Sequence, residues 1–217
     1  MTETEKITIG LVVAPGVTER LGESLIQELP DVLSEQYNNK KEWTIDLVTD
    51  PLTGFAESVD EIFKKVADYH DKRQWDYVIS ITDLPMFAEH QVMALDINMY
   101  NGAAIFSYPA FGWRPVKKRF KQAIVSIIQE LHEAENVDRN YDDNNNIETS
   151  VSRQFPLSKI SKTKVYLEET DSYHLRYLSD SRSRGMFRLV SGMTFANNPL
   201  NMMASLSNIV AIAFTTG

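Results

Sequence analysis

The chain has 217 residues, 43% of them hydrophobic and 24% charged, which suits one globular domain with an appended segment. Its net charge of -8 at pH 7 argues against general nucleic-acid binding, which needs a basic face. There is no cysteine, which excludes disulfides, thiolate metal sites and cysteine nucleophiles, and the four histidines have no metal-ligand spacing. The acidic, polar first residues do not form a secretory signal, so we expect a cytosolic domain.

The first third of the chain alternates strands with helices. An apolar run at 7–13 predicts a strand, and leucines at helical spacing predict a helix from about 17 to 36, with Thr18 as its N-cap. Pro30 is expected to kink or divide that helix. A second strand is predicted at 43–48, a helix that Ser58 caps from there to 69, and a third strand at 76–81.

The middle of the chain completes a sheet. Residues 92–97 predict an edge or hairpin strand, residues 103–108 a further strand, and residues 115–131 a long helix with an apolar stripe. This order predicts a three-layer, Rossmann-like or flavodoxin-like α/β domain over residues 1–135, with a mainly parallel sheet and an edge hairpin.

The last third differs in composition. Residues 136–162 are polar and acidic and predict a linker or surface loop. Residues 163–198 are predicted to be a membrane-proximal segment, with a strand at 164–167 that returns to a sheet edge and a helix at 181–197.

The 29 residues after Arg188 include no charged side chain. Such a run fits a buried terminal helix, but we favour a second interpretation, the start of a transmembrane helix at 199–217 that is truncated at Gly217. The arginines just before it (Arg176, Arg182, Arg184 and Arg188) fit the excess of positive charge on the cytosolic side of membrane spans. We therefore expect this domain at the cytoplasmic face of the cell membrane.

Candidate ligand-binding residues follow the predicted strands. Ligands of doubly wound sheets bind at the carboxyl ends of the strands, and the residues expected there are Pro15, Gly16, Thr18, Asp50, Thr82, Asp83 and Tyr108. Asp83 is the strongest candidate, because a carboxylate after an apolar strand either caps neighbouring backbone or contacts a ligand. The alternative is that these residues simply terminate strands.

A basic cluster crowds the start of the helix at 115–131: Arg114, Lys117, Lys118 and Arg119. Cations at a helix N-terminus oppose the helix dipole, so they predict a site for a small anion or for anionic lipid. The alternative is a solvated basic face that the acidic linker balances.

Motifs for nucleotides are missing from the first turn. Residues 14–18 include one glycine, without the glycine pattern of dinucleotide sites or a Walker lysine. The sequence names no cofactor and no metal site.

Three strings, at 81–85 (ITDLP), 107–112 (SYPAFG) and 191–199 (SGMTFANNP), resemble a family of uncharacterised bacterial membrane proteins. The resemblance implies an amino-terminal α/β domain that precedes several membrane spans. Some members carry the label methylenetetrahydrofolate dehydrogenase/cyclohydrolase. Tyr37-x-x-x-Lys41 has the spacing of the catalytic tyrosine and lysine of that enzyme, and Asp83-Leu84-Pro85-Met86 is similar to its Gln-Leu-Pro-Leu-Pro segment. The glycine-rich NADP loop of that enzyme has no counterpart here, and Tyr37 and Lys41 also fit a solvated helix end.

The leading hypothesis is therefore a membrane-tethered sensing or interaction domain without catalysis of its own. The alternative is a small-molecule enzyme, folate-linked by the resemblance, that uses Asp83 with Lys41. A pure assembly module is the third possibility. The sequence names no ligand and no oligomeric state.

Overall fold

The computed structural model describes residues 5–55, 58–88, 90–112, 116–136, 151, 153–154, 160–167, 172–179 and 182–195. The strands are β1 (Glu5–Val13), β2 (Lys41–Thr49), β3 (Tyr77–Thr82), β4 (Met86–Ala88), β5 (Gln91–Asn98), β6 (Ala103–Ser107), β7 (Ile160–Leu167) and β8 (Ser172–Ser179). The helices are α1 (Val17–Gln36), α2 (Leu52–Phe55), α3 (Val59–Arg73), α4 (Val116–Asn136) and α6 (Arg182–Phe195), with a 3-10 turn η1 (Tyr108–Phe111).

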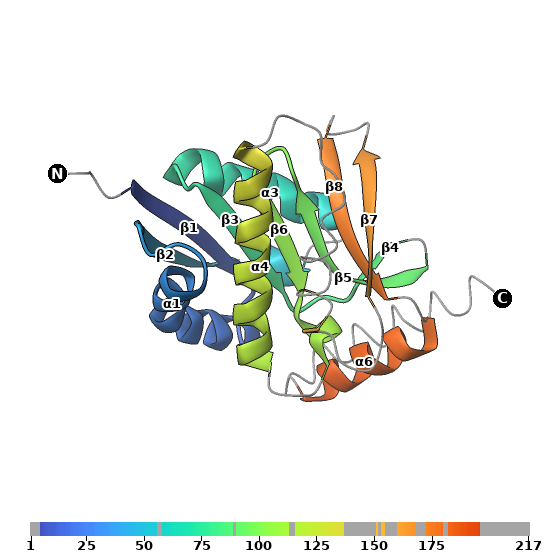
Figure 1. Cartoon of the computed structure of the whole chain (residues 1–217). Helices are drawn as coiled ribbons and strands as arrows, with labels where there is room; N and C mark the ends of the chain where they lie inside the picture. Colours follow the sequence, from blue (N-terminus) through green and yellow to red (C-terminus); the bar gives the residue numbers. More distant parts are fainter. Residues whose placement is uncertain are drawn as a thin grey trace.

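One eight-stranded sheet runs through the molecule, and its two halves differ in strand direction (Figure 1). The order is β2-β1-β3-β6-β5-β8-β7, and β4 pairs with β5 beside this path. The first four strands are parallel, whereas every pairing that involves β5, β8 or β7 is antiparallel. The prediction of a mixed α/β fold is confirmed, but the sheet is parallel only in its first half.

β5 explains the difference. We predicted an edge or hairpin strand at 92–97. The hairpin is confirmed, because β5 pairs antiparallel with β6, but β5 lies inside the sheet between β6 and β8 rather than at its edge. Its residues 92–98 are all buried. A strand that is buried on both faces shows no apolar–polar alternation, so nothing in its sequence marks its second antiparallel pairing, with β8.

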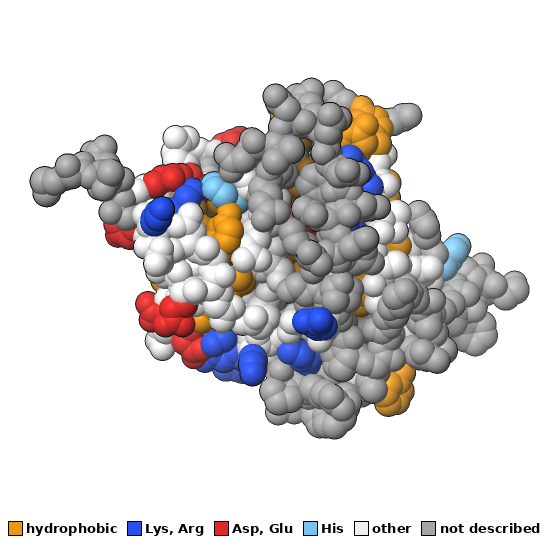
Figure 2. All heavy atoms as spheres, in the orientation of Figure 1, with side chains coloured by type: hydrophobic (Ala, Val, Ile, Leu, Met, Phe, Trp, Pro, Cys, Tyr) orange, Lys and Arg blue, Asp and Glu red, His pale blue; other side chains and the backbone are white. Residues whose placement is uncertain are grey.

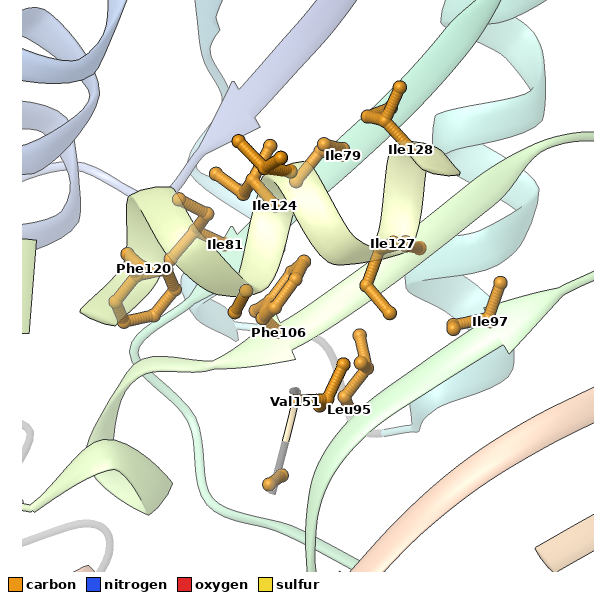
Figure 3. Close-up of a cluster of buried hydrophobic side chains, with 14 of the residues drawn as sticks. Ile79, Ile81, Leu95, Ile97, Phe106, Phe120, Ile124, Ile127, Ile128 and Val151 are labelled. Carbon is orange, nitrogen blue, oxygen red and sulfur yellow. The ribbon is translucent and has the colours of Figure 1, made fainter. Parts of the chain in front are cut away.

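Helices cover both faces of the sheet. α1 and α4 lie side by side on one face, and α3 lies on the other (Figure 1). Figure 3 shows the core under α4, where Phe120, Ile124 and Ile127 pack toward Phe106 and Ile81 of the sheet. On the opposite face, a separate core joins α3 to β1, β3 and β6 through Ile62, Phe63, Val66, Val12, Val78 and Ile105.

α1 begins and continues differently from the prediction. Its N-cap is Gly16, at φ 94°, a conformation that glycine adopts readily. Thr18 lies inside the helix, where its hydroxyl donates to the Ala14 carbonyl (2.5 Å), so the N-cap prediction was wrong. The helix also continues undivided past Pro30, because a buried stripe that includes Leu29 and Leu33 holds it against the sheet.

α3 has both of its ends defined by the sequence. Ser58 Oγ accepts a hydrogen bond from the Glu61 backbone N–H (3.3 Å), which confirms the predicted cap. After Arg73, Gln74 adopts a left-handed conformation at φ 57° and ends the helix.

The next residue, Trp75, lies directly on the backbone of β1. A methyl group added at Gly10 would come within 1.9 Å of the Trp75 ring, so only glycine fits there. The indole N–H donates to Asp46 Oδ2 (3.1 Å), and Tyr69 of α3 stacks on the ring.

Two strands of the last third extend the sheet. β7 forms its outer edge, which confirms the predicted edge strand at 164–167, and β8 joins β7 to β5. β8 was not predicted, and it belongs to the segment that was assigned as membrane-proximal. α6 corresponds to the predicted helix at 181–197.

The predicted transmembrane helix at 199–217 and most of the predicted linker at 136–162 lie outside the described residues. Within the described ranges, no helix has the length and apolarity that a membrane span requires. The division of the chain into four parts stays a prediction.

Candidate functional site

The parallel half of the sheet changes direction between β1 and β3, and we use the name crevice for the region between the carboxyl ends of these two strands. The chain leaves β1 toward β2 on one side and returns through α3 to β3 on the other. Such a change of direction is where doubly wound sheets bind ligands. Five of the predicted residues, Pro15, Gly16, Asp50, Thr82 and Asp83, lie at this edge.

The turn that leads into α2 lies at this crevice, where hydrogen bonds join it to β1 and β3. The Asp50 N–H donates to the Val13 carbonyl (2.9 Å), and the Thr82 hydroxyl donates to the Thr53 carbonyl. Thr82 is fully buried and also accepts the Leu84 N–H (3.0 Å). Thr82 therefore holds the turn in place, as the strand-terminating alternative predicted.

Asp83 is packed against the same turn. Its side chain is 7% exposed, and a methyl group added at Gly54 would lie 3.1 Å from Asp83 Oδ1 and 3.2 Å from the Cβ of Ala14. Burial raises the pKa of Asp83 to about 6, and a hydrogen bond to its own backbone opposes that shift only in part. A carboxyl group with this pKa exchanges its proton near neutral pH.

Asp50 is the second buried acid at this edge, and α3 neutralises it. Tyr69 donates to Asp50 Oδ2 (2.7 Å), and Lys65 Nζ lies 3.4 Å from the same oxygen. That hydrogen bond raises the pKa of the Tyr69 hydroxyl. Asp50 thus joins α3 to the end of β2.

Tyr108 lies on the other side of the crevice, at the start of η1. Its ring stacks on Phe120 of α4. Burial raises the pKa of its hydroxyl, while the charges of Arg119 and Arg20 lower it. Two arginines therefore lie near this hydroxyl.

The predicted anion cluster at the start of α4 is engaged largely by the protein itself. Lys117 and Lys121 both bind Glu28 of α1, and they hold its pKa down at about 2. Arg119 donates to the carbonyls of Phe111 and Gln154. Figure 2 shows basic and acidic side chains together over the neighbouring ends of α1 and α4. Lys118 is exposed, Arg114 lies outside the described residues, and the anion or lipid site stays a prediction.

Tyr37 and Lys41 lie at the opposite edge of the sheet. Lys41 is the first residue of β2 rather than part of a ragged helix end, and its Nζ contacts Glu5 Oε1 (3.0 Å) and His132 Nε2 (3.1 Å). Tyr37 packs against Trp43 and His132. Since β2 runs its whole length between Lys41 and the carboxyl edge, the structure does not bring Lys41 to Asp83.

A cleft of about 400 Å³ opens beside the crevice, between the start of α3 and the β3–β4 connection. Ile62, Met86 and Met93 line it with apolar surface, and Ser58, Asp60 and Arg176 contribute polar groups. Its volume lies in the range of small-molecule sites. None of the predicted ligand-binding residues lines it, although Leu84 and Pro85 directly follow Asp83.

Arg176 reaches the cleft from β8, where a buried polar chain holds it. Its Nε donates to Asp96 Oδ2 (3.0 Å), and His174 Nδ1 lies 2.9 Å from Asp96 Oδ1. We had assigned Arg176 to the flank of a membrane span, but this ion pair places it in the sheet. The signal that sequence reasoning missed is the row of His174, Arg176 and Leu178, which points to one face of an unrecognised strand.

This series of polar contacts from Arg176 through Asp96 and His174 continues to Ser172, whose Oγ lies 3.2 Å from His174 Nε2. Serine, histidine and aspartate stand in the contact order of a hydrolase triad. Ser172 is only 3% exposed and His174 1%, so a substrate cannot reach the hydroxyl. The series of polar contacts therefore serves to hold Arg176 in position.

With this geometry established, the chain was compared with known proteins. No family model, curated protein or solved structure matches it. The resemblance to a family of bacterial membrane proteins therefore stays a prediction. Among the described residues, no three acidic or histidine side chains come together as metal ligands.

Proposed function

We propose that the chain is a small-molecule-binding domain that senses its ligand at the cytoplasmic face of a membrane, without catalysis of its own. The observation that carries the ligand-binding part is the cleft beside the crevice at the carboxyl edge. Its lining combines apolar side chains with the polar groups of Ser58, Asp60 and Arg176, and a mixture of the two orients small organic ligands.

The strand order supports the same proposal. The parallel strands follow the order β2-β1-β3-β6, with helices on both faces. That order matches the first four strands of a flavodoxin-like sheet, so we infer a Rossmann-like or flavodoxin-like parallel half. Folds of this kind bind their ligands at the edge where the cleft lies.

A thermal-shift screen of nucleotides, folates and small carboxylates tests ligand binding. We expect at least one compound to raise the melting temperature of the chain, and we expect Ala88→Trp to abolish that rise. Ala88 lines the cleft from the short strand β4, where a larger side chain fills the opening. The control is Lys64→Trp, an exposed position of α3 outside the cleft. If no compound stabilises the chain, or if Ala88→Trp has no effect, the proposal is wrong.

The charge-free run of 189–217 supports membrane attachment. We expect the expressed chain to sediment with membranes and to need detergent for release. The double substitution Ile209→Lys with Ile212→Lys is expected to release it, because each lysine at the centre of a span costs about 3 kcal/mol. Ile209→Leu with Ile212→Leu is the matched control and should stay with the membranes. A wild-type chain that stays in the supernatant would contradict the tether but not the cleft.

A further inference from the structure

We propose that the cleft binds a small carboxylate with an apolar body, and that the guanidinium of Arg176 holds its carboxylate group. The inference rests on the proposed ligand-binding function and narrows it to one class of ligand. Three observations support it: how Arg176 is held, which charges face the cleft, and what lines the remainder.

Arg176 is oriented before any ligand arrives. Its Nε binds Asp96, which is 1% exposed, and its side chain remains 19% exposed where it lines the cleft. Its terminal nitrogens make no hydrogen bond with another described residue. A guanidinium fork matches the two oxygens of a carboxylate, and a fork that is already fixed loses little freedom on binding.

The buried residues behind Asp96, His174 and Ser172, hold the carboxylate to which Arg176 is bound. If Asp96 accepts the His174 Nδ1–H, then His174 Nε2 is the acceptor for the Ser172 hydroxyl. His174 also packs edge-on against Phe63 of α3. The carboxylate of Asp96 is thus fixed on both oxygens, by His174 on one and by Arg176 on the other.

The charge of the cleft favours a monoanion over a dianion. Arg176 and Asp60 are the ionisable side chains among the described residues that line it. A phosphate monoester would bring up to two negative charges to a cleft where Asp96 already pairs with Arg176 and where Asp60 also lines the wall. A single carboxylate adds only one negative charge beside the Arg176–Asp96 ion pair, and the nearby amino end of α3, at Ser58 and Val59, adds a small positive potential.

The rest of the lining suits a hydrocarbon body. Pro85 and Phe87, which are half-buried, supply apolar side chains from the β3–β4 connection and β4, above the buried side chains of Ile62, Met86 and Met93. A ligand with a carboxylate for Arg176 and a short branched or linear hydrocarbon for the apolar lining therefore suits this cleft.

Calorimetric titration of the full chain with 4-methylpentanoate, L-leucine and inorganic phosphate tests the inference. We expect at least one of the two carboxylates to bind saturably, and phosphate not to bind. Arg176→Lys keeps the charge but removes the fork, so it should weaken binding about tenfold or more. Arg20→Lys, an exposed arginine outside the cleft, is the matched control and should bind like the wild type.

Arg176→Lys could fail to fold because Asp96 is buried, so Ala88→Trp provides a second test that leaves the ion pair intact. It should abolish carboxylate binding. The inference is overturned if neither carboxylate binds, if phosphate binds as tightly, or if Arg176→Lys binds like the wild type. A compound without a carboxylate that stabilises the chain, and loses this effect in Ala88→Trp but not in Arg176→Lys, would overturn the inference and leave the proposed function standing.

Discussion

Asp83 and Asp96 are both buried acids of the sheet, yet their surroundings differ. Asp83 lies in the crevice of the parallel half, where burial is the largest influence on its pKa and raises it. Asp96 lies in the antiparallel half, between His174 and Arg176. The protein therefore tolerates a costly carboxylate at the first position and builds a compensated one at the second.

The contrast separates two positions at the carboxyl edge of the sheet, the crevice at Asp83 and the cleft beside Arg176. The α2 turn occupies the crevice at Asp83, so the edge where doubly wound sheets bind ligands is partly closed. The cleft lies one step along the same edge, where the antiparallel strand β8 brings in a fixed arginine. The antiparallel half of the sheet thus contributes a positively charged side chain at this edge. Four substitutions test this contrast, from the largest expected effect to the smallest.

Asp96→Ala removes the carboxylate that faces both His174 and Arg176. We expect the free energy of unfolding to fall by about 3–5 kcal/mol, because a buried charge loses its partner. Urea denaturation measures the change. The control is Asp71→Ala, an exposed position where a change below about 0.5 kcal/mol is expected. A loss at Asp96 as small as that at Asp71 would remove the contrast.

Asp83→Asn should have the opposite sign. The pKa of Asp83 is about 6 in the folded protein, against an ordinary value of 3.8. Between these values the unfolded chain has lost the proton that the folded chain keeps, so stability falls as the pH rises through this range. At pH 8 the substitution should raise the free energy of unfolding by about 2–3 kcal/mol, and below about pH 4 the gain should vanish. Urea denaturation at both pH values checks this, and an equal gain at both would contradict the burial argument.

Tyr69→Phe removes the hydroxyl that donates to Asp50. Asp50 is buried and charged, so we expect a loss of about 1.5 kcal/mol, smaller than that for Asp96 because Lys65 still neutralises the acid. Thermal and urea unfolding measure the loss. Tyr100→Phe, at an exposed tyrosine, should change stability little and serves as the control.

Lys72→Ala breaks an ion pair with Asp68 that is exposed on the surface of α3. The expected change is below about 0.5 kcal/mol, and it should disappear in high salt. Urea denaturation at low and high salt measures it. A loss comparable with that of Asp96→Ala would show that burial does not decide which pairs matter in this protein.

Much of the fold was predictable where the sequence pattern is local. The strand at 7–13, the cap at Ser58 and the apolar stripe of α4 carry their structure in neighbouring residues. The hairpin of β5 with β6 was predictable, but its pairing with β8 was not, since the residues of β5 are buried on both faces and show no period. β8 was missed because its tyrosines, histidine and arginine lack a clean alternation of apolar and polar residues.

The candidate site was predictable only in position. The strand order places polar residues at the carboxyl edge, and Asp83 is there as expected. The role of Arg176 depends on Asp96, 80 residues away along the chain, and no local pattern connects the two. For Lys41 and Asp83 the sequence led to the opposite error. The resemblance suggested that they act together, but the length of β2 separates them.

The close packing of the Trp75 ring on Gly10 makes the fluorescence of this tryptophan sensitive to the position of α3. The indole touches the backbone of β1 on one side and Tyr69 of α3 on the other, while Asp46 holds its N–H. Any outward movement of α3, the helix whose first turn borders the cleft, would expose this chromophore to water and shift its emission to longer wavelengths. A ligand that displaces α3 would therefore be expected to change the emission of Trp75, and Trp75→Phe identifies its share beside Trp43 and Trp113.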